Sequence, residues 1–303
     1  MASRDPTTRV SGRRIWLMAA RPRTLPAAVA PVLVGTALAQ YDHVFHLLRF
    51  LAALVGAVFI QIGTNLSNDY SDARRGADTD DRLGPVRVTA GGLVPPRQVL
   101  RATYVSFGVA VLAGVYLIVV AGWQLLLVGA ASILAGVLYT GGPRPYGYEG
   151  LGEAFVFLFF GIVAVAGSYF VQVKHLDWEA FALAVPVGLI AAAILVVNNI
   201  RDLDTDRRAH KRTLAVRLGR AQTRTMYAVI VYLAYLLTPV TWVFGPLDPW
   251  VFLPWLTLPL AASLVRTVRN RTDGPSLNEA LAQTGMLQLA FCVLLSAGLL
   301  LSR

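Results

Sequence analysis

Long runs without a charged residue constrain this chain more than any other feature of its sequence. A helix needs about 20 mostly apolar residues to cross the roughly 30 Å of hydrocarbon in a bilayer. The runs that approach or exceed this length are Thr24–Tyr41, Phe50–Asn68, Ala102–Pro143, Ala154–Val173, Ala180–Ile200, Thr225–Leu247, Pro249–Val265 and Ala280–Ser302. Helices of soluble proteins keep a polar face, which these runs lack. We therefore expect an all-α, polytopic membrane protein.

The run Ala102–Pro143 is about twice as long as one membrane span and is expected to contain two. Its segment Ala121–Gln124, AGWQ, supplies a tight turn between them. Two helices here bring the expected total to nine transmembrane helices. The loops between the runs are mostly short and contain no Ser/Gly-rich linker, so residues 1–303 are expected to form a single integral-membrane domain.

The distribution of basic residues predicts the orientation in the membrane. If nine spans alternate, 24 of the 27 Lys and Arg residues fall on the side of the amino terminus, and only Arg49, Lys174 and Arg303 fall on the other. Positively charged loops stay in the cytoplasm. We therefore expect a multi-pass protein of the bacterial cytoplasmic membrane with a cytoplasmic N-terminus. This bias, with contact to anionic membrane lipid, accounts for the net charge of +10 without a nucleic-acid partner.

Two of the apolar runs end in clusters of acidic and amide residues. The first cluster lies in GTNLSNDYSDARRGADTDDR, residues 63–82, and the second in NNIRDLDTDRRAHKRT, residues 198–213. Residues three or four apart share one face of a helix, so each cluster forms a stripe. The stripes are Asn65, Asn68, Asp69 and Asp72 in the first cluster, and Asn198, Asn199, Asp202 and Asp206 in the second. Asp204 is expected to point elsewhere.

Both clusters are predicted at the cytoplasmic ends of spans, and ionisable residues at the rim of a membrane usually mark function. Carboxylates this dense repel one another unless a cation lies between them. Oxygen-only ligands favour Mg²⁺, which is commonly shared between one or two carboxylates and a substrate phosphate. Two facing clusters would then clamp a diphosphate, with Arg74, Arg75, Lys211 and Arg212 neutralising the remaining charge. For one cluster alone, a solvated loop is the alternative.

Four motifs resemble those of the UbiA superfamily of intramembrane aromatic prenyltransferases. They are ARPRTLPAAVAPVLVG (residues 20–35), NDYSDARRGAD (68–78), YTGGPRPYGYEGLGE (139–153) and RDLDTDRRAHKRTLAVRLG (201–219). The resemblance covers almost the whole chain and is strongest to the branch that prenylates 1,4-dihydroxy-2-naphthoate. The chain departs from the family pattern at two positions. Gly76 replaces a third acid, which leaves Asp78 as the nearest candidate, and His210 stands where a glycine is expected.

The resemblance implies a role for each motif residue. The Mg²⁺ ligands would be Asn68, Asp69, Asp72, Asp78, Asp202 and Asp206. Among them, the catalytic carboxylates would be Asp69, Asp72, Asp202 and Asp206. The residues expected to contact the diphosphate are Lys211, Arg144, Tyr139, Asn65 and Asn198. Arg23 or Arg21 would bind the carboxylate of the aromatic acceptor.

The implied activity is the transfer of a polyprenyl group from polyprenyl diphosphate to 1,4-dihydroxy-2-naphthoate. Carbon dioxide and diphosphate leave, and the product is a demethylmenaquinone, an intermediate of menaquinone biosynthesis. A family member with another aromatic acceptor, such as 4-hydroxybenzoate, is one alternative. A secondary transporter with duplicated acidic cation sites is the other. The sequence specifies neither the prenyl length nor an oligomeric state.

Overall fold

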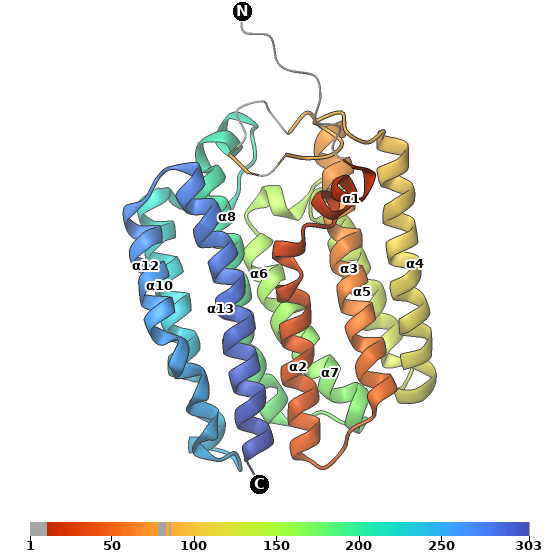
Figure 1. The fold of residues 1–303 in the computed structure, drawn as a ribbon, viewed down its shortest axis with the longest axis vertical. Helices are drawn as coiled ribbons and strands as arrows, with labels where there is room; N and C mark the ends of the chain where they lie inside the picture. Colours follow the sequence, from red (N-terminus) through yellow and green to blue (C-terminus); the bar gives the residue numbers. More distant parts are fainter. Residues whose placement is uncertain (1–10, 78–82, 85, 303) are drawn as a thin grey trace, which may run out of the picture.

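The computed structural model describes residues 11–77, 83–84 and 86–302, and these residues form a bundle of helices without a strand (Figure 1). The long helices are α2 (Pro26–Tyr41), α3 (Leu47–Arg74), α4 (Pro96–Ala121), α5 (Gln124–Leu138), α8 (Trp178–Arg208), α10 (Arg220–Leu237), α12 (Leu258–Asn270) and α13 (Gly274–Leu301). The shorter elements are α1 (Gly12–Ala20), η1 (Pro22–Thr24), η2 (Tyr146–Glu149), α6 (Gly152–Val156), the π-helix η3 (Phe157–Val163), α7 (Ala164–Val173), α9 (Leu214–Leu218), α11 (Val240–Val243) and η4 (Pro249–Thr257).

Every predicted apolar run is helical over most of its length. The long run divides as expected, because α4 ends at Ala121 and Gly122 adopts a φ of 141° before α5 begins at Gln124. Seven helices in the described residues are long and apolar enough to span a bilayer, and the pair α1–η1 and α2, bent by 50°, would be an eighth. The 15 residues of α5 cover only about 22 Å. Length and composition therefore identify eight of the nine predicted spans in the described residues, and α5 would be the ninth.

The main hydrophobic core lies where α2, α7, α8, α10, α12 and α13 meet. Helix α8 runs through it and is buried on most sides, as its Ala- and Val-rich sequence requires. On one side α8 approaches η3 so closely that a Cβ atom on Gly161 would lie 2.5 Å from the Cα of Gly188. Only glycine fits at such a contact. This packing fixes α8, which carries the second acidic cluster, against the α6–η3–α7 rod.

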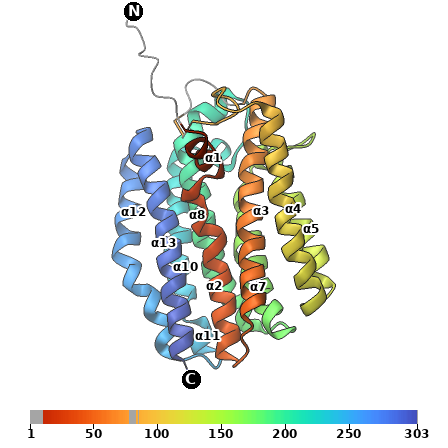
Figure 2. The ribbon, with the colours of Figure 1, turned by 45° about the vertical axis from the view of Figure 1, so that its right-hand side comes forward.

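Helix α1 lies across one end of the bundle instead of continuing α2 (Figures 1 and 2). The bend follows Arg21, whose φ of 53° ends α1 in the left-handed conformation, and Pro22 and Pro26 start the next two elements. On its inner side, Ala19 packs with Leu66 of α3 in a second, smaller core. The turn at Arg21 is therefore held against the polar end of α3.

Both acidic clusters lie at the same end of the bundle, which is also the end that α1 crosses (Figure 1). Helices α3 and α8 both finish there, and the C-terminus lies at the opposite end. Lys211, just after α8, comes within 4.0 Å of Asp72 in the last turn of α3. The two clusters thus converge as the sequence predicted.

Candidate active site

A cavity of about 560 Å³ opens beside these two helix ends and continues into the bundle. Its polar end includes Asp72 from α3, Asp202 and Asp206 from α8, and Lys211. Its other end is lined by apolar side chains of α3, α4, α5 and α7. One site therefore combines charged groups with a hydrophobic channel.

The channel reaches the outer surface of the bundle between α4 and α5. Val111 and Val115 on α4 line the cavity and yet are about half exposed, at 48% and 51%. Leu126 on α5 lines it as well and is 58% exposed. In a bilayer these helix faces meet lipid, so a long apolar chain can leave the site sideways.

Asp72 is a buried carboxylate of the polar end that is bonded from outside its own helix. Its carboxylate accepts hydrogen bonds from Arg87, at 2.8 Å, and from the Tyr148 hydroxyl, at 2.5 Å. The Lys211 ammonium is 4.0 Å away. Asp72 itself is 1% exposed, so these cations supply the compensation that a buried carboxylate needs.

Tyr148 connects three segments of the site. Its ring lies under the Lys211 ammonium, 4.8 Å from the ring centre, and its backbone carbonyl accepts a hydrogen bond from the Arg212 amide. Burial, and then the charge of Asp72, raise the pKa of the Tyr148 hydroxyl above its ordinary value. Tyr148 therefore stays protonated and donates to Asp72, which joins the 139–151 loop to both acidic clusters.

Asp69, the other carboxylate of the first motif, has a different environment. Its two oxygens accept hydrogen bonds from the backbone amides of Val88 and Thr89, at 3.0 and 2.9 Å, and it is not among the residues that line the cavity. It is also only 1% exposed. Through these two bonds Asp69 holds the chain that carries Arg87. Each carboxylate oxygen keeps a second lone pair, so the predicted role as a metal ligand is compatible with these two bonds.

An Asp69→Ala variant distinguishes the two roles. Two buried amides would lose their acceptor, so we expect the free energy of unfolding to fall by about 2 kcal/mol or more. The measurement is the thermal unfolding midpoint in detergent, with Asp204→Ala as an exposed control. An unchanged midpoint combined with lost activity would instead support the predicted role in metal binding.

In the second cluster, Arg201 organises the side chains. Its guanidinium contacts the carboxylate of Asp202 at 2.5 and 2.7 Å and donates to Asn198 at 2.8 Å. Arg201 is 3% exposed and is anchored further by Asn278 of α13. Asp204 instead points outward and pairs with Arg220, as its position between the stripe residues predicted.

Most of the remaining predicted site residues line the cavity, and a few do not. Those that line the cavity are Asn65, Asn68, Tyr139, Asn198, Arg21 and Lys211. Arg23 and Arg144 are exposed and are not among its lining residues, so the structure does not bring them to the site. Asp78 lies outside the described residues. His210 adopts a φ of 56°, in the left-handed region that favours glycine.

The lining residues suit a hard cation by their donor type. Carboxylates of Asp72, Asp202 and Asp206 and the amides of Asn68 and Asn198 line one cavity. Within the described residues, no three His, Cys, Asp or Glu side chains are close enough together to form a complete metal site. Arg87, Arg201 and Lys211 instead lie beside the carboxylates. Oxygen ligands and uncompleted coordination fit Mg²⁺ bound jointly with a substrate phosphate.

Sequence reasoning missed Arg87 and Tyr148, which line the cavity, and also Arg201 and Glu153, which bond to residues of its wall. Glu153 is 8% exposed and accepts a hydrogen bond from Asn199 at 2.8 Å. A charged or hydroxyl side chain that is buried beside the acidic clusters indicates a site residue, but its burial is visible only in the structure. Of the four, Arg201 was detectable, because it directly follows the apolar run Ala180–Ile200 and precedes the second acidic motif.

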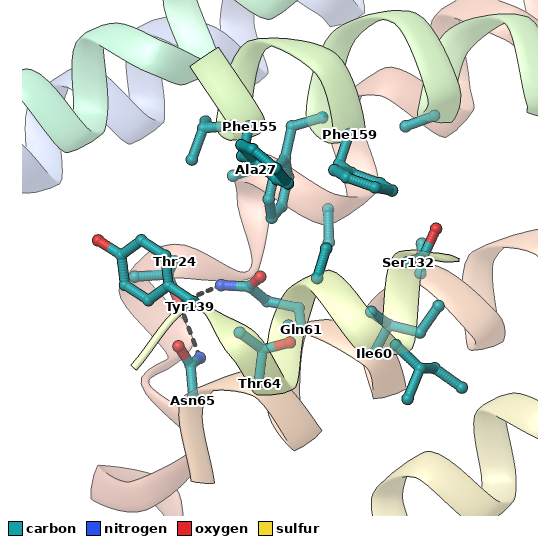
Figure 3. A pocket seen from close by; sticks show the side chains of 18 of the residues that line it. Thr24, Ala27, Ile60, Gln61, Thr64, Asn65, Ser132, Tyr139, Phe155 and Phe159 are labelled. Carbon is teal, nitrogen blue, oxygen red and sulfur yellow. Dashed lines mark hydrogen bonds between the residues drawn. The ribbon is translucent and has the colours of Figure 1, made fainter. Parts of the chain in front are cut away.

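Aromatic side chains form one wall of the cavity next to its polar end. Tyr146 lies edge-on to Tyr139, with ring centres 5.5 Å apart, and stacks on Phe155 at 4.0 Å. Phe159 continues the series at 6.1 Å from Phe155. Figure 3 shows Tyr139, Phe155 and Phe159 around the cavity. The faces of such rings attract a cation.

Comparison with known proteins identifies the family to which a chain with this site belongs. Residues 28–300 match the model of the UbiA prenyltransferase family. The chain belongs to this family. It is 42% identical to the 1,4-dihydroxy-2-naphthoate octaprenyltransferase of Mycobacterium leprae, over 95% of this chain and 96% of the relative. It is 34% identical to the enzyme of the same name from Bacillus subtilis, over 98% and 95%.

The fold of the UbiA family is also recognisable in the structure. A UbiA homolog from Archaeoglobus fulgidus, solved with DMAPP and Mg²⁺, superimposes with a TM-score of 0.69 over 94% of this chain and 98% of that one. The two sequences are 13% identical, so this likeness establishes the fold alone.

Proposed function

We propose that the protein transfers a polyprenyl group from polyprenyl diphosphate to 1,4-dihydroxy-2-naphthoate, with loss of carbon dioxide and diphosphate, in menaquinone biosynthesis. The convergence of Asp72, Asp202, Asp206 and Lys211 on one cavity that continues as an apolar channel carries this proposal. The names of the relatives above support the choice of acceptor. A transporter would instead be expected to hold its acidic sites near the membrane midplane.

The residues of the polar end divide the work of binding the diphosphate. Asp72, Asp202 and Asp206 would hold Mg²⁺, which when bound supplies the charge that stabilises a departing diphosphate. Lys211 and Arg87 would neutralise what charge remains on the leaving group, because both already lie beside Asp72. Asn68, which accepts a hydrogen bond from Thr140 at 2.9 Å, would complete the oxygen donors.

The other walls serve the prenyl group and the acceptor. The carbon–oxygen bond of the prenyl diphosphate breaks, and a ring carbon of the acceptor forms the new bond to the same prenyl carbon. The aromatic wall of Tyr139, Tyr146 and Phe155 would stabilise the allylic cation between these events. The surrounding apolar surface excludes water, which would otherwise capture the cation. Of the two predicted acceptor arginines, Arg21 fits, because it lines the cavity whereas Arg23 does not.

The predicted nine-span topology and its orientation are part of this proposal. The end of the bundle that carries both acidic clusters and α1 would face the cytoplasm, where the water-soluble acceptor and Mg²⁺ are found. The bias of basic residues towards this end supports that orientation.

The decisive test is a product assay with the purified protein. With Mg²⁺, a polyprenyl diphosphate and 1,4-dihydroxy-2-naphthoate, we expect release of carbon dioxide and a prenylated 1,4-dihydroxynaphthalene, which oxygen in air oxidises to the naphthoquinone that is detected. EDTA should abolish product formation, and added Mg²⁺ should restore it, because the carboxylates cannot hold a diphosphate without a cation. Product formed only from 4-hydroxybenzoate in a mixture of acceptors would overturn the assignment of the acceptor, and activity in EDTA would overturn the metal.

A further inference from the structure

We propose that the carbonyl oxygens of Gln61 and Asn65 accept hydrogen bonds from the two ring hydroxyl groups of the aromatic acceptor, and that Thr24 holds both amides in this orientation. The three side chains come together in the wall of the cavity, where η1 meets α3 (Figure 3). The inference rests on the proposed function and names the residues that would select the acceptor.

The hydrogen bonds of Thr24 determine how the two amides are turned. Its hydroxyl donates its one proton to the carbonyl of Arg21, at 2.9 Å. It can then only accept, and it does so from the Gln61 and Asn65 amide nitrogens, both at 3.1 Å. Asn65 directs its second N–H to the carbonyl of Ala20, at 3.0 Å. Both amides therefore face η1 with their nitrogens.

The carbonyl oxygens of these amides are left for a ligand. Neither Gln61 Oε1 nor Asn65 Oδ1 has a hydrogen-bond partner within the described part of the chain, although the residues are only 8% and 4% exposed. Both residues line the cavity. Neither oxygen is among the buried side-chain atoms that lack a partner, so both are accessible from the cavity. A ligand that brings donors can therefore bond to them. Both N–H groups of Asn65 already donate to Ala20 and Thr24. In this orientation Asn65 has no donor left for the diphosphate contact predicted from sequence.

The two substrates differ in the groups that they could offer here. A diphosphate presents only acceptor oxygens, which two carbonyls would repel, and a polyprenyl chain has no polar hydrogen. A dihydroxylated ring presents two donors. Gln61 and Asn65 are one helical turn apart on α3, about 6 Å, which is close to the separation of two oxygens on opposite carbons of one ring. A hydroxyl that donates to a carbonyl also makes its ring more electron-rich and so more nucleophilic.

The position along α3 agrees with this assignment. Asn65 lies about two turns before Asp72, so a ring bound at Gln61 and Asn65 would lie next to the site of the diphosphate. Arg21 lines the same part of the cavity, and its carbonyl is the group that orients Thr24. Its guanidinium would bind the carboxylate of the same ring. The acceptor would thus be bound at three groups, its two hydroxyls and its carboxylate.

The experiment combines Gln61→Met and Asn65→Leu with two ligands that each lack one hydroxyl, 1-hydroxy-2-naphthoate and 4-hydroxy-2-naphthoate. Dissociation constants are measured by calorimetry in EDTA without the prenyl donor, for wild type and both variants. We expect each variant to bind 1,4-dihydroxy-2-naphthoate about tenfold more weakly. Each variant should bind one of the two analogues as well as wild type does. That analogue lacks the hydroxyl that would have donated to the carbonyl removed in the variant, so no further hydrogen bond is lost.

Thr24→Val tests the orienting role, since it keeps the shape of Thr24 and frees both amides to rotate. It should weaken binding of the dihydroxylated ligand but leave the KM for polyprenyl diphosphate within about twofold of wild type, which also shows that the variant is folded. Gln283→Met, the same exchange on an exposed face of α13, is the control and should change neither quantity.

Equal losses of affinity for both analogues in wild type and in the variants would overturn the inference, because they would show no coupling between carbonyl and hydroxyl. The inference would also be overturned if the variants raised the KM for polyprenyl diphosphate and left the affinity for the acceptor unchanged. If wild-type protein prenylates 1,4-dihydroxy-2-naphthoate while these results are obtained, only the acceptor contact is refuted. If it does not, the proposed function itself has failed.

Discussion

An Asp72→Asn variant is expected to lose about three orders of magnitude in kcat, while the chain remains folded. The exchange keeps the shape of the side chain but removes the charge that holds Arg87 and Lys211 at the polar end of the cavity. It also removes a proposed ligand of Mg²⁺. The effect should fall on turnover, because the lost interaction develops its full strength only as the diphosphate leaves.

The measurement is product formation at saturating substrates, with Mg²⁺ titrated for wild type and variant. Tyr148→Phe provides a graded comparison, since it removes one hydrogen bond to Asp72 and should cost about tenfold. Glu279→Gln, which neutralises an exposed carboxylate on α13, should leave turnover unchanged. Turnover of Asp72→Asn within tenfold of wild type would show that this carboxylate is dispensable and would refute its role.

The second large effect is expected from a matched pair of variants within the second acidic cluster. Asp202→Asn should lower turnover by about 10²- to 10³-fold, whereas Asp204→Asn should stay within about twofold, because surface ion pairs contribute little. The two carboxylates are separated by one residue and carry the same charge. Asp202 faces the cavity beside the buried Arg201, and Asp204 is 61% exposed on the opposite side, paired with Arg220.

The same assay measures both variants in parallel, together with the Mg²⁺ concentration that gives half-maximal activity. We expect this concentration to rise for Asp202→Asn and to stay constant for Asp204→Asn. Similar losses in both would mean that the cluster acts through its overall charge, and the stripe geometry would then be irrelevant. A loss in Asp204→Asn alone would reverse the assignment.

Sequence patterns located site residues well on regular helices, where the periodicity of the helix decides which way a side chain points. Asn68, Asp72, Asn198, Asp202 and Asp206 all line the cavity, because residues on one face of a helix stay on that face in any packing. Asp69 shows the limit of this argument. Its spacing from Asn65 and Asp72 places it in the same stripe, yet it lies 100° around the helix from Asn68, and its oxygens accept hydrogen bonds from the backbone amides of Val88 and Thr89.

Residues outside regular helices were less predictable. Arg144 appeared suitable as the one basic residue of its loop, but the loop turns Tyr148 to the site and leaves Arg144 exposed. Arg21 and Arg23 were equivalent in sequence. The left-handed turn at Arg21 separates them, because it places Arg21 in the cavity wall and Arg23 outside. Loop conformations depend on contacts that are distant in the chain, and a local pattern does not contain these.

The sequence by itself determined the membrane-helical class, the division of the long run at Gly122, and the two acidic helix ends. These follow from hydrophobic length, turn propensity and helical periodicity, all of which act over neighbouring residues. Only the tertiary structure decided which groups meet at the cavity. Arg87 reaches Asp72, Tyr148 bridges to Lys211, and Thr24 turns the amides of Gln61 and Asn65. Such contacts join segments far apart in the chain, and packing of the whole bundle sets them.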